Sequence, residues 1–233
     1  MIRNYLFSIL FFTGIVFISI VFLPTLFLPK YFVLTGGKLM GFWTGICLRL
    51  FLSVKIFIKG KENIITNGKF FIAASHQSMF ETFYLQTIFN SPVFILKKEL
   101  LSIPVFGWYL KKIGSIAIKR EKITKDNLNF FEDILKFINK YKRPLIIFPQ
   151  GTRVLPNERP SFKKGVSRIY NELNITCQPI AINSGNVWPK NGIKKANRTI
   201  TISILKPIPS GLPKEDFLKI LEDNIYSELD LIN

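Results

Sequence analysis

The chain contains a single histidine, His76, and an acidic residue, Glu81, follows it at the fifth position. His76 comes directly after an apolar stretch of strand character, Phe70–Ala74, and just before a stretch of helical character. A carboxylate that accepts a hydrogen bond from one imidazole nitrogen fixes the tautomer and leaves the other nitrogen as a base. His76 and Glu81 are therefore candidates for proton transfer.

The same segment also has a purely structural interpretation. Ser78 and Glu81 have the spacing of a capping box, with Ser78 as the N-cap and Glu81 at the third helical position. This geometry directs the Glu81 side chain back past the N-cap, toward His76. Capping and catalysis are therefore compatible, and this segment alone supports either.

Basic residues form a second group of candidates. Lys119 and Arg120 directly follow the apolar stretch Ser115–Ile118, and eight basic residues fall between Lys97 and Lys125. Arginine is scarce in this chain, with 8 arginines against 24 lysines. A guanidinium binds phosphate in a bidentate manner, which an ammonium cannot do.

Two further strand ends carry polar residues. Leu145–Phe148 runs into Pro149, Gln150, Gly151, Thr152 and Arg153, a turn that offers close backbone approach at the glycine, a hydroxyl and a guanidinium. By itself such a turn is equally an ordinary loop. The segment Gln178–Gly185 is another strand that ends in small polar residues.

Together the four motifs resemble the lysophosphatidic acid acyltransferase family, the 1-acylglycerol-3-phosphate O-acyltransferases. The family pattern is a His with an acid five residues on, a basic Arg motif, Phe-Pro-Glu-Gly-Thr-Arg and a Val-Pro-Val-type strand. The resemblance runs from about Ser75 to Gly185. Glu81 stands where the family usually has Asp, and Gln150 stands where it usually has Glu.

The resemblance implies an activity and roles for these residues. The phosphate of a lysophosphatidate would bind Lys119, Arg120 and the turn that follows Leu145–Phe148. His76 would take the proton from the 2-hydroxyl of the same lysophosphatidate. That oxygen would attack an acyl thioester, either acyl-CoA or an acylated carrier protein, with no metal or other cofactor. Glu81 would orient His76, and Ser78 and Gln150 would support the site. The turn residues expected to bind phosphate are Gly151, Thr152 and Arg153.

Backbone N–H groups near Gly151 or at the helix start by Ser78 are expected to stabilise the oxyanion of the intermediate. Neither cysteine lies in a motif, and a Gly-x-Ser-x-Gly nucleophile turn is missing from the sequence, so no acyl-enzyme is required. A second enzyme hypothesis keeps the fold but takes another lysolipid or an aminolipid as acceptor. The rival from another class is a basic membrane-bound nucleic-acid-binding or scaffold protein.

The elements that must position these residues alternate between strands and helices. Short stretches rich in β-branched and aromatic residues occur seven times, and amphipathic stretches separate several of them. This alternation predicts a single α/β domain with a mixed, mainly parallel central sheet flanked by helices. The expected strands are Val54–Ile58, Phe70–Ala74, Val93–Leu96, Ser115–Ile118, Leu145–Phe148, Pro179–Ile182 and Thr199–Leu205, and the expected helices are Glu81–Phe89, Lys125–Lys140, Lys163–Glu172 and Lys214–Leu229.

The N-terminal segment has a different character. Tyr5 to Leu23 is 19 residues without a charge, which suits a membrane-embedded helix better than a cleaved signal peptide. The glycine-interrupted stretch Tyr31–Phe57 is typical of an interfacial helix or half-hairpin. We therefore expect a membrane anchor over residues 1–58 and the acyltransferase domain over 59–233. Lys30 and Lys38 favour the cytoplasmic face of the inner membrane for that domain.

Composition agrees with this organisation. The 233 residues combine 48% hydrophobic content with a net charge of +17, which excludes a disordered chain and favours anionic membrane lipids as partners. The nucleic-acid rival predicts aromatics interleaved with basic residues, whereas the aromatics here concentrate in the N-terminus and strands. The two cysteines, Cys47 and Cys177, are too few for a disulfide framework.

Overall fold

The computed structural model of the chain describes residues 2–118, 132, 134, 136–138 and 143–233. These residues divide into two compact units, each built from two segments of the chain. The first unit combines Met1–Cys47 with Thr82–Leu145, and the second combines Leu48–Glu81 with Ile146–Asn233. The predicted boundary between an anchor and an α/β domain at residues 58 and 59 stays a prediction.

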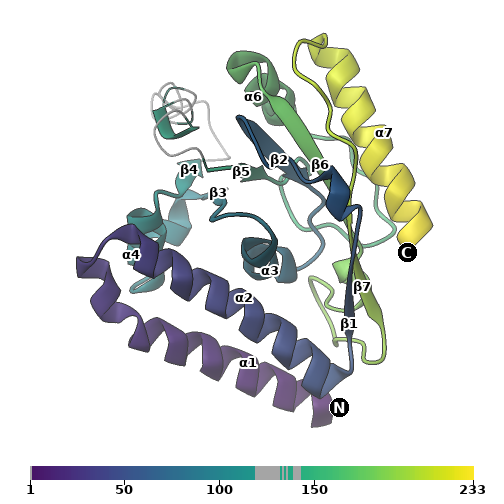
Figure 1. Cartoon of the computed structure of the whole chain (residues 1–233). Helices are drawn as coiled ribbons and strands as arrows, with labels where there is room; N and C mark the ends of the chain where they lie inside the picture. Colours follow the sequence, from purple (N-terminus) through teal and green to yellow (C-terminus); the bar gives the residue numbers. More distant parts are fainter. Residues whose placement is uncertain (1, 119–131, 133, 135, 139–142) are drawn as a thin grey trace. The chain divides into compact units, whose positions relative to one another are not determined.

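Two long helices begin the first unit. The helix α1 (Ile2–Val21) and the helix α2 (Lys30–Leu52) run antiparallel, joined through the short 3-10 helix η1 (Leu23–Phe27) (Figure 1). Trp43 of α2 donates a 3.3 Å hydrogen bond from Nε1 to the carbonyl of Phe11. A Cβ at Gly14 would lie 2.1 Å from that Nε1, so only glycine lets the two helices approach this closely.

Among the described helices, α1 alone is long and apolar enough to cross a membrane. Its large side chains are mostly exposed, with Ile9, Phe12 and Phe17 each more than half accessible. An exposed apolar surface of this extent fits association with lipid. In the stretch Tyr31–Phe57, expected to form an interfacial helix or half-hairpin, residues up to Leu52 belong to the continuous helix α2, and the stretch ends in the strand β1 (Lys55–Lys59).

The rest of the first unit packs on this pair of helices. Gly41 of α2 lies against α3 (Phe80–Ile88), where a Cβ would come within 2.6 Å of the Phe83 carbonyl oxygen. The strands β3 (Val93–Lys97) and β4 (Ile116–Ile118) pair in parallel. Between them lie two helices that the sequence did not predict, η3 (Lys98–Ser102) and α4 (Phe106–Ile113).

The second unit contains a mixed sheet. The strand order is β1, β7, β6, β2, in which β1 pairs with β7 and β2 pairs with β6 in parallel, whereas β6 and β7 are antiparallel. β-Branched and aromatic residues form these strands because their side chains pack well on a pleated surface. The bounds are β1 (Lys55–Lys59), β2 (Phe70–Ala74), β6 (Thr176–Ile182) and β7 (Thr199–Ile204).

Two helices cover this sheet. The helix α6 (Gly165–Leu173) and the helix α7 (Lys214–Ile232) lie beside each other, and α7 also packs along β6 (Figure 1). The ring of Phe217 on α7 stacks on Tyr170 of α6 and meets Phe71 of β2 edge to face, so all three rings are buried in one core.

The predicted fold class is confirmed. Strands and helices alternate along the chain, and three of the four strand pairings described above are parallel. The strand β5 (Leu145–Ile147) also falls where it was expected. Most of the helix predicted over 125–140 lies outside the described residues. β6 begins at Thr176, three residues before the expected start at Pro179.

Candidate active site

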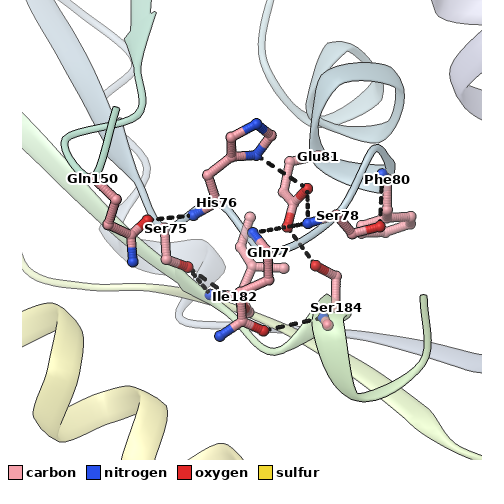
Figure 2. A network of polar contacts seen from close by, with 10 residues as sticks. Ser75, His76, Gln77, Ser78, Phe80, Glu81, Gln150, Ile182 and Ser184 are labelled. Atoms are coloured by element: carbon pink, nitrogen blue, oxygen red, sulfur yellow. Dashed lines mark hydrogen bonds and ion pairs between the residues drawn. The ribbon is translucent and has the colours of Figure 1, made fainter. Parts of the chain in front are cut away.

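His76 and Glu81 lie at the junction between β2 and α3, as the sequence predicted (Figure 2). The Nδ1 atom of His76 is 3.5 Å from Oε2 of Glu81. A well-formed hydrogen bond spans about 2.7–3.2 Å, and such contacts in catalytic pairs shorten when substrate binds. The His76 ring also stacks on Phe148, with ring centroids 4.0 Å apart. Its side chain retains 14% exposure, so the imidazole can reach a substrate.

The Glu81 carboxylate is fully buried and accepts several hydrogen bonds. The backbone N–H groups of Gln77 and Ser78 donate to it at 3.1–3.2 Å, and the hydroxyl of Ser184 donates to Oε1. These donors stabilise a buried charge that would otherwise be costly. The carboxylate is therefore available to the imidazole as a fixed partner.

The capping box predicted for this segment is formed in part. The Glu81 carboxylate reaches back to the Ser78 N–H as expected. The Ser78 hydroxyl, however, accepts from the N–H of Phe80 at 3.1 Å, two residues on, because α3 begins at Phe80 rather than directly after Ser78. Glu81 therefore caps the helix and contacts His76 at the same time.

Gln150 holds the backbone of His76. Its Oε1 accepts a 2.7 Å hydrogen bond from the His76 N–H, and the Val154 N–H donates to the His76 carbonyl at 2.9 Å. The nearby Tyr226 is buried, and this burial raises the pKa of its phenol to about 12. The peptide of His76 is thus fixed on both sides by the segment after β5. This contact gives the predicted supporting residue Gln150 a physical role.

The turn after β5 presents a different surface. The Gly151 N–H donates to the Phe148 carbonyl at 2.9 Å, and Gly151 adopts a left-handed conformation with φ +75°. Thr152 is exposed and Arg153 is half-buried. Neither Thr152 nor Arg153 forms a side-chain hydrogen bond or ion pair with another described residue. The Arg153 guanidinium is free, within the described chain, to bind an anion.

The structure narrows the expected source of oxyanion stabilisation. The N–H of Gly151 donates to Phe148, and the N–H of Ser78 donates to Glu81. These two N–H groups are therefore engaged in internal hydrogen bonds, and oxyanion stabilisation by other N–H groups near Gly151 or at the helix start stays a prediction. The predicted anion-binding residues Lys119 and Arg120 lie outside the described residues, so their placement beside Arg153 stays a prediction.

Several residues at the site lie within the sequence motifs, but no role was predicted for them from the sequence. Ser184 donates to Glu81 from the end of β6, and the adjacent Gly185 N–H donates to Oε1 of Gln77 at 3.0 Å. The Ser75 hydroxyl accepts from the Ile182 N–H at 2.8 Å. The segment Gln178–Gly185, the fourth motif, thus supports the first motif, which contains His76 and Glu81. Its run of small polar residues was the only sequence signal for this contact.

Lys163 is a further cation that the sequence motifs did not include. Its aliphatic stem covers the turn, since a Cβ on Gly151 would lie 3.3 Å from Lys163 Cγ. The Lys163 side chain is exposed. A second positive charge therefore lies next to the phosphate-binding turn that the sequence predicts.

The buried cysteine of this unit is unsuited to nucleophilic catalysis. Cys177 lies within β6, and burial raises the pKa of its thiol well above the usual value. A thiol that stays protonated is a poor nucleophile. Across the described ranges, no group of three or more His, Cys, Asp or Glu side chains has a geometry that could hold a metal ion.

The part of the chain that contains the candidate site matches a known protein family. Residues 55–183, more than half of the chain, match the family described as Acyltransferase. The chain belongs to this family. The match includes the His76–Glu81 junction, the turn after β5 and the whole of β6, and it ends one residue before Ser184.

Curated members of the family are similar to this chain. A 1-acyl-sn-glycerol-3-phosphate acyltransferase of Pseudomonas aeruginosa is 33% identical over 67% of this chain and 60% of that protein. The enzyme of the same name from Saccharomyces cerevisiae is 30% identical over 78% of this chain and 62% of that protein. The chain thus spans about three fifths of the length of these relatives.

A solved structure shares the fold. The crystal structure of the 1-acyl-sn-glycerophosphate acyltransferase PlsC from Thermotoga maritima aligns with a TM-score of 0.77 and 23% identity. The alignment covers 98% of this chain and 95% of that one. At this identity the likeness shows the fold alone.

Proposed function

We propose that this chain transfers a fatty acyl group from an acyl thioester to the 2-hydroxyl of a 1-acylglycerol 3-phosphate and so forms phosphatidic acid. The observation that carries the proposal is the pairing of the only histidine with a buried carboxylate at the start of α3. The curated relatives named as 1-acyl-sn-glycerol-3-phosphate acyltransferases support the choice of acceptor.

His76 is the general base in this proposal. With Nδ1 facing Glu81, Nε2 takes the proton from the acceptor hydroxyl as its oxygen attacks the thioester carbonyl. The tetrahedral intermediate collapses with loss of the thiolate, which receives the proton from His76. The products are phosphatidic acid and the free thiol of coenzyme A or of the carrier protein.

The Glu81 carboxylate stabilises the imidazolium that forms between these two proton transfers. Because Glu81 is buried and held by several donors, its position does not depend on the substrate. Pre-organised charge of this kind lowers the barrier without reorganisation during the reaction.

The cations near the turn bind the acceptor phosphate in this proposal. Arg153 supplies a guanidinium that pairs with no other described residue, and Lys163 lies over Gly151. A phosphate bound by a guanidinium gains charge-assisted hydrogen bonds in a planar fork. Lys119 and Arg120 are proposed to complete this anion site.

The proposed location is the cytoplasmic face of the inner membrane, with α1 as part of the anchor. The apolar exposed surface of α1 and the net charge of +17 support attraction to an anionic lipid surface. Both the acceptor and the product of the proposed reaction are lipids, so an anchored enzyme acts where they reside.

An acyl-transfer assay tests the proposal. The full chain in membranes is supplied with labelled acyl-CoA or acylated carrier protein and with lysophosphatidate, a neutral lysolipid or an aminolipid. We expect labelled phosphatidic acid with lysophosphatidate only, and no product from His76→Ala membranes with the same protein content. Preferred acylation of a lysolipid without a terminal phosphate would refute the proposed acceptor.

A further inference from the structure

Ser184 is a buried hydroxyl within the segment Gln178–Gly185, to which the sequence motifs assigned no role of its own. It lies at the start of the 3-10 helix η5 (Ser184–Asn186), directly beyond the end of β6. Its side chain is fully buried, and its Oγ contacts Oε1 of Glu81, 103 residues away in the sequence (Figure 2). The contact brings the fourth motif to the catalytic carboxylate.

The direction of this hydrogen bond follows from the groups involved. An ionised carboxylate has only acceptor sites, so the Ser184 hydroxyl donates its hydrogen to Glu81. The Ser184 backbone is itself held, because its carbonyl accepts from the N–H groups of Val187 and Trp188 at 3.0 and 2.7 Å. The donor is therefore fixed in place by the fold rather than by Glu81.

The two oxygens of the carboxylate have different surroundings. Oε1 accepts from the Gln77 N–H, the Ser78 N–H and the Ser184 hydroxyl. Oε2 accepts from the Ser78 N–H and faces Nδ1 of His76. A partial rotation of the carboxylate about its last torsion would carry the facing oxygen away from Nδ1 and lengthen its hydrogen bonds to these donors. Ser184 opposes that rotation from the side away from His76.

A glutamate needs such a restraint more than an aspartate does. Its extra methylene adds one rotatable bond, and the terminal sp³–sp² torsion has a broad energy well. The backbone N–H groups of Gln77 and Ser78 lie on one side of the carboxylate, on the chain segment before α3. The hydroxyl of Ser184, from the start of η5, provides a third contact that fixes the plane of the carboxylate.

We propose that Ser184 is a positioning residue that orients the Glu81 carboxylate so that Oε2 faces Nδ1 of His76. By this contact Ser184 keeps the proton of the neutral imidazole on Nδ1 and leaves Nε2 as the base. The consequence for acyl transfer rests on the proposed function, whereas the orientation of the pair does not. Ser184 acts through Glu81 and touches neither substrate nor imidazole.

Nitrogen NMR of the single histidine provides a direct test. Because the chain contains one histidine, the two imidazole nitrogen signals of a tag-free, ¹⁵N-labelled chain in detergent belong to His76. At a pH where the ring is neutral, we expect the signals of an Nδ1–H tautomer in the wild type. Ser184→Ala should move both signals toward the average of the two tautomers, and Ser184→Thr, which keeps the hydroxyl, should restore them.

Kinetics provide the second readout. Loss of one hydrogen bond to a charged group costs about a factor of ten in rate when it acts on the transition state. We therefore expect Ser184→Ala to lower kcat about tenfold, with the KM of lysophosphatidate unchanged, and Ser184→Thr to recover most of the loss. A general structural defect in Ser184→Ala would instead reduce the fraction of folded protein, and Ser184→Thr would then not restore kcat selectively.

The chain offers a matched control in Ser203. This serine is also buried, and its hydroxyl donates a 2.7 Å hydrogen bond to Glu228, a serine–glutamate pair between β7 and α7. Ser203→Ala removes the same type of bond away from the site. It should change the melting temperature about as much as Ser184→Ala while leaving the His76 signals and kcat unchanged.

The outcomes separate this inference from the proposed function. Unchanged His76 signals in folded Ser184→Ala would overturn the positioning role, whatever the enzyme acylates. Shifted signals in a chain without lysophosphatidate acyltransferase activity would support the positioning role and refute the proposed function. If Ser184→Ala fails to fold, Ser184→Cys keeps the volume with a weaker donor. Wild-type signals in that variant would equally contradict the proposal.

Discussion

Two segments that follow strands contribute to the candidate site, and they differ in how their polar side chains are satisfied. At the β2–α3 junction, the side chains of Ser75, Ser78 and Glu81 are buried and hydrogen-bonded within the protein. In the turn after β5, Thr152 is exposed and Arg153 has no polar partner among the residues described. In one segment these side chains are satisfied within the protein, whereas the other presents polar groups to solvent.

The difference follows from the cost of burying charge. A buried carboxylate without donors would be destabilising, so the junction must satisfy Glu81 during folding. A guanidinium that remains partly in water needs no such partner and can exchange water for a phosphate. We infer that the junction sets the rate of proton transfer and that the turn sets the affinity for the acceptor. Substitutions in the two segments should therefore affect different kinetic constants.

The largest effect is expected for His76→Ala. Removal of the proposed general base should lower kcat by about 10³-fold or more, while the melting temperature changes little because the imidazole is partly exposed. Acyl transfer to lysophosphatidate, normalised to folded protein by its thermal transition, measures the loss. Activity close to that of the wild type would remove His76 from the mechanism and with it the contrast between the two segments.

Glu81→Gln should lower kcat by roughly ten- to a hundredfold, because one acceptor oxygen is replaced by an amide group that cannot stabilise the imidazolium. The loss should exceed what the shift in melting temperature explains. Glu81→Asp is the matched control, since it keeps the charge but shortens the reach to His76. If the loss in Glu81→Gln equals the loss of folded protein, Glu81 is only a helix cap.

Arg153→Ala should raise the KM for lysophosphatidate about tenfold and leave the KM for the acyl thioester unchanged, because a charge-assisted contact to phosphate is lost. Steady-state kinetics with each substrate varied in turn check this split. Arg168→Ala serves as a control, since Arg168 is an exposed arginine of α6 beside Glu172. An equal effect of both substitutions would show general attraction to the lipid surface rather than a specific contact.

The smallest effect is expected for Gly151→Ala, which tests the shape of the turn. At φ +75° an alanine is strained, and its Cβ would press on Lys163 at 3.3 Å. The expected destabilisation is about 1–2 kcal/mol, equivalent to a lower Tm by about 2–4 °C per kcal/mol. Gly165→Ala is the control in open space at the start of α6. An equal change in Tm for both variants would contradict strain at Gly151.

The strands could be predicted because their residue types are determined locally. Phe70–Ala74 and Thr199–Ile204 are rich in apolar or β-branched residues, and both appear within a residue of their expected ends. The helix α4 was missed because a segment of eight residues with a glycine gives too short a periodic signal. The start of β6 was placed at Pro179 because proline usually begins a strand, whereas here it lies inside one.

The site was predictable to the extent that its residues are near each other in sequence. A stretch of six consecutive residues contains His76, Ser78 and Glu81. Their spacing in the sequence therefore indicated that their side chains contact one another. The contacts of Gln150 with the His76 peptide and of Ser184 with Glu81 depend on which strands become neighbours in the sheet. No local pattern encodes that choice, so these two roles required the structure.

The contact between Ser184 and Glu81 also has a consequence for biosynthesis. A ribosome adds roughly 5–20 residues per second, so the 103 residues between them take about 5–20 s to make. Throughout that interval the nascent chain carries the histidine and its acid but not the strand that brings the serine. The contact itself therefore forms only after β6 is inserted between β2 and β7. On the growing polypeptide, α1 and the His76–Glu81 junction are therefore made before the serine that contacts the acid.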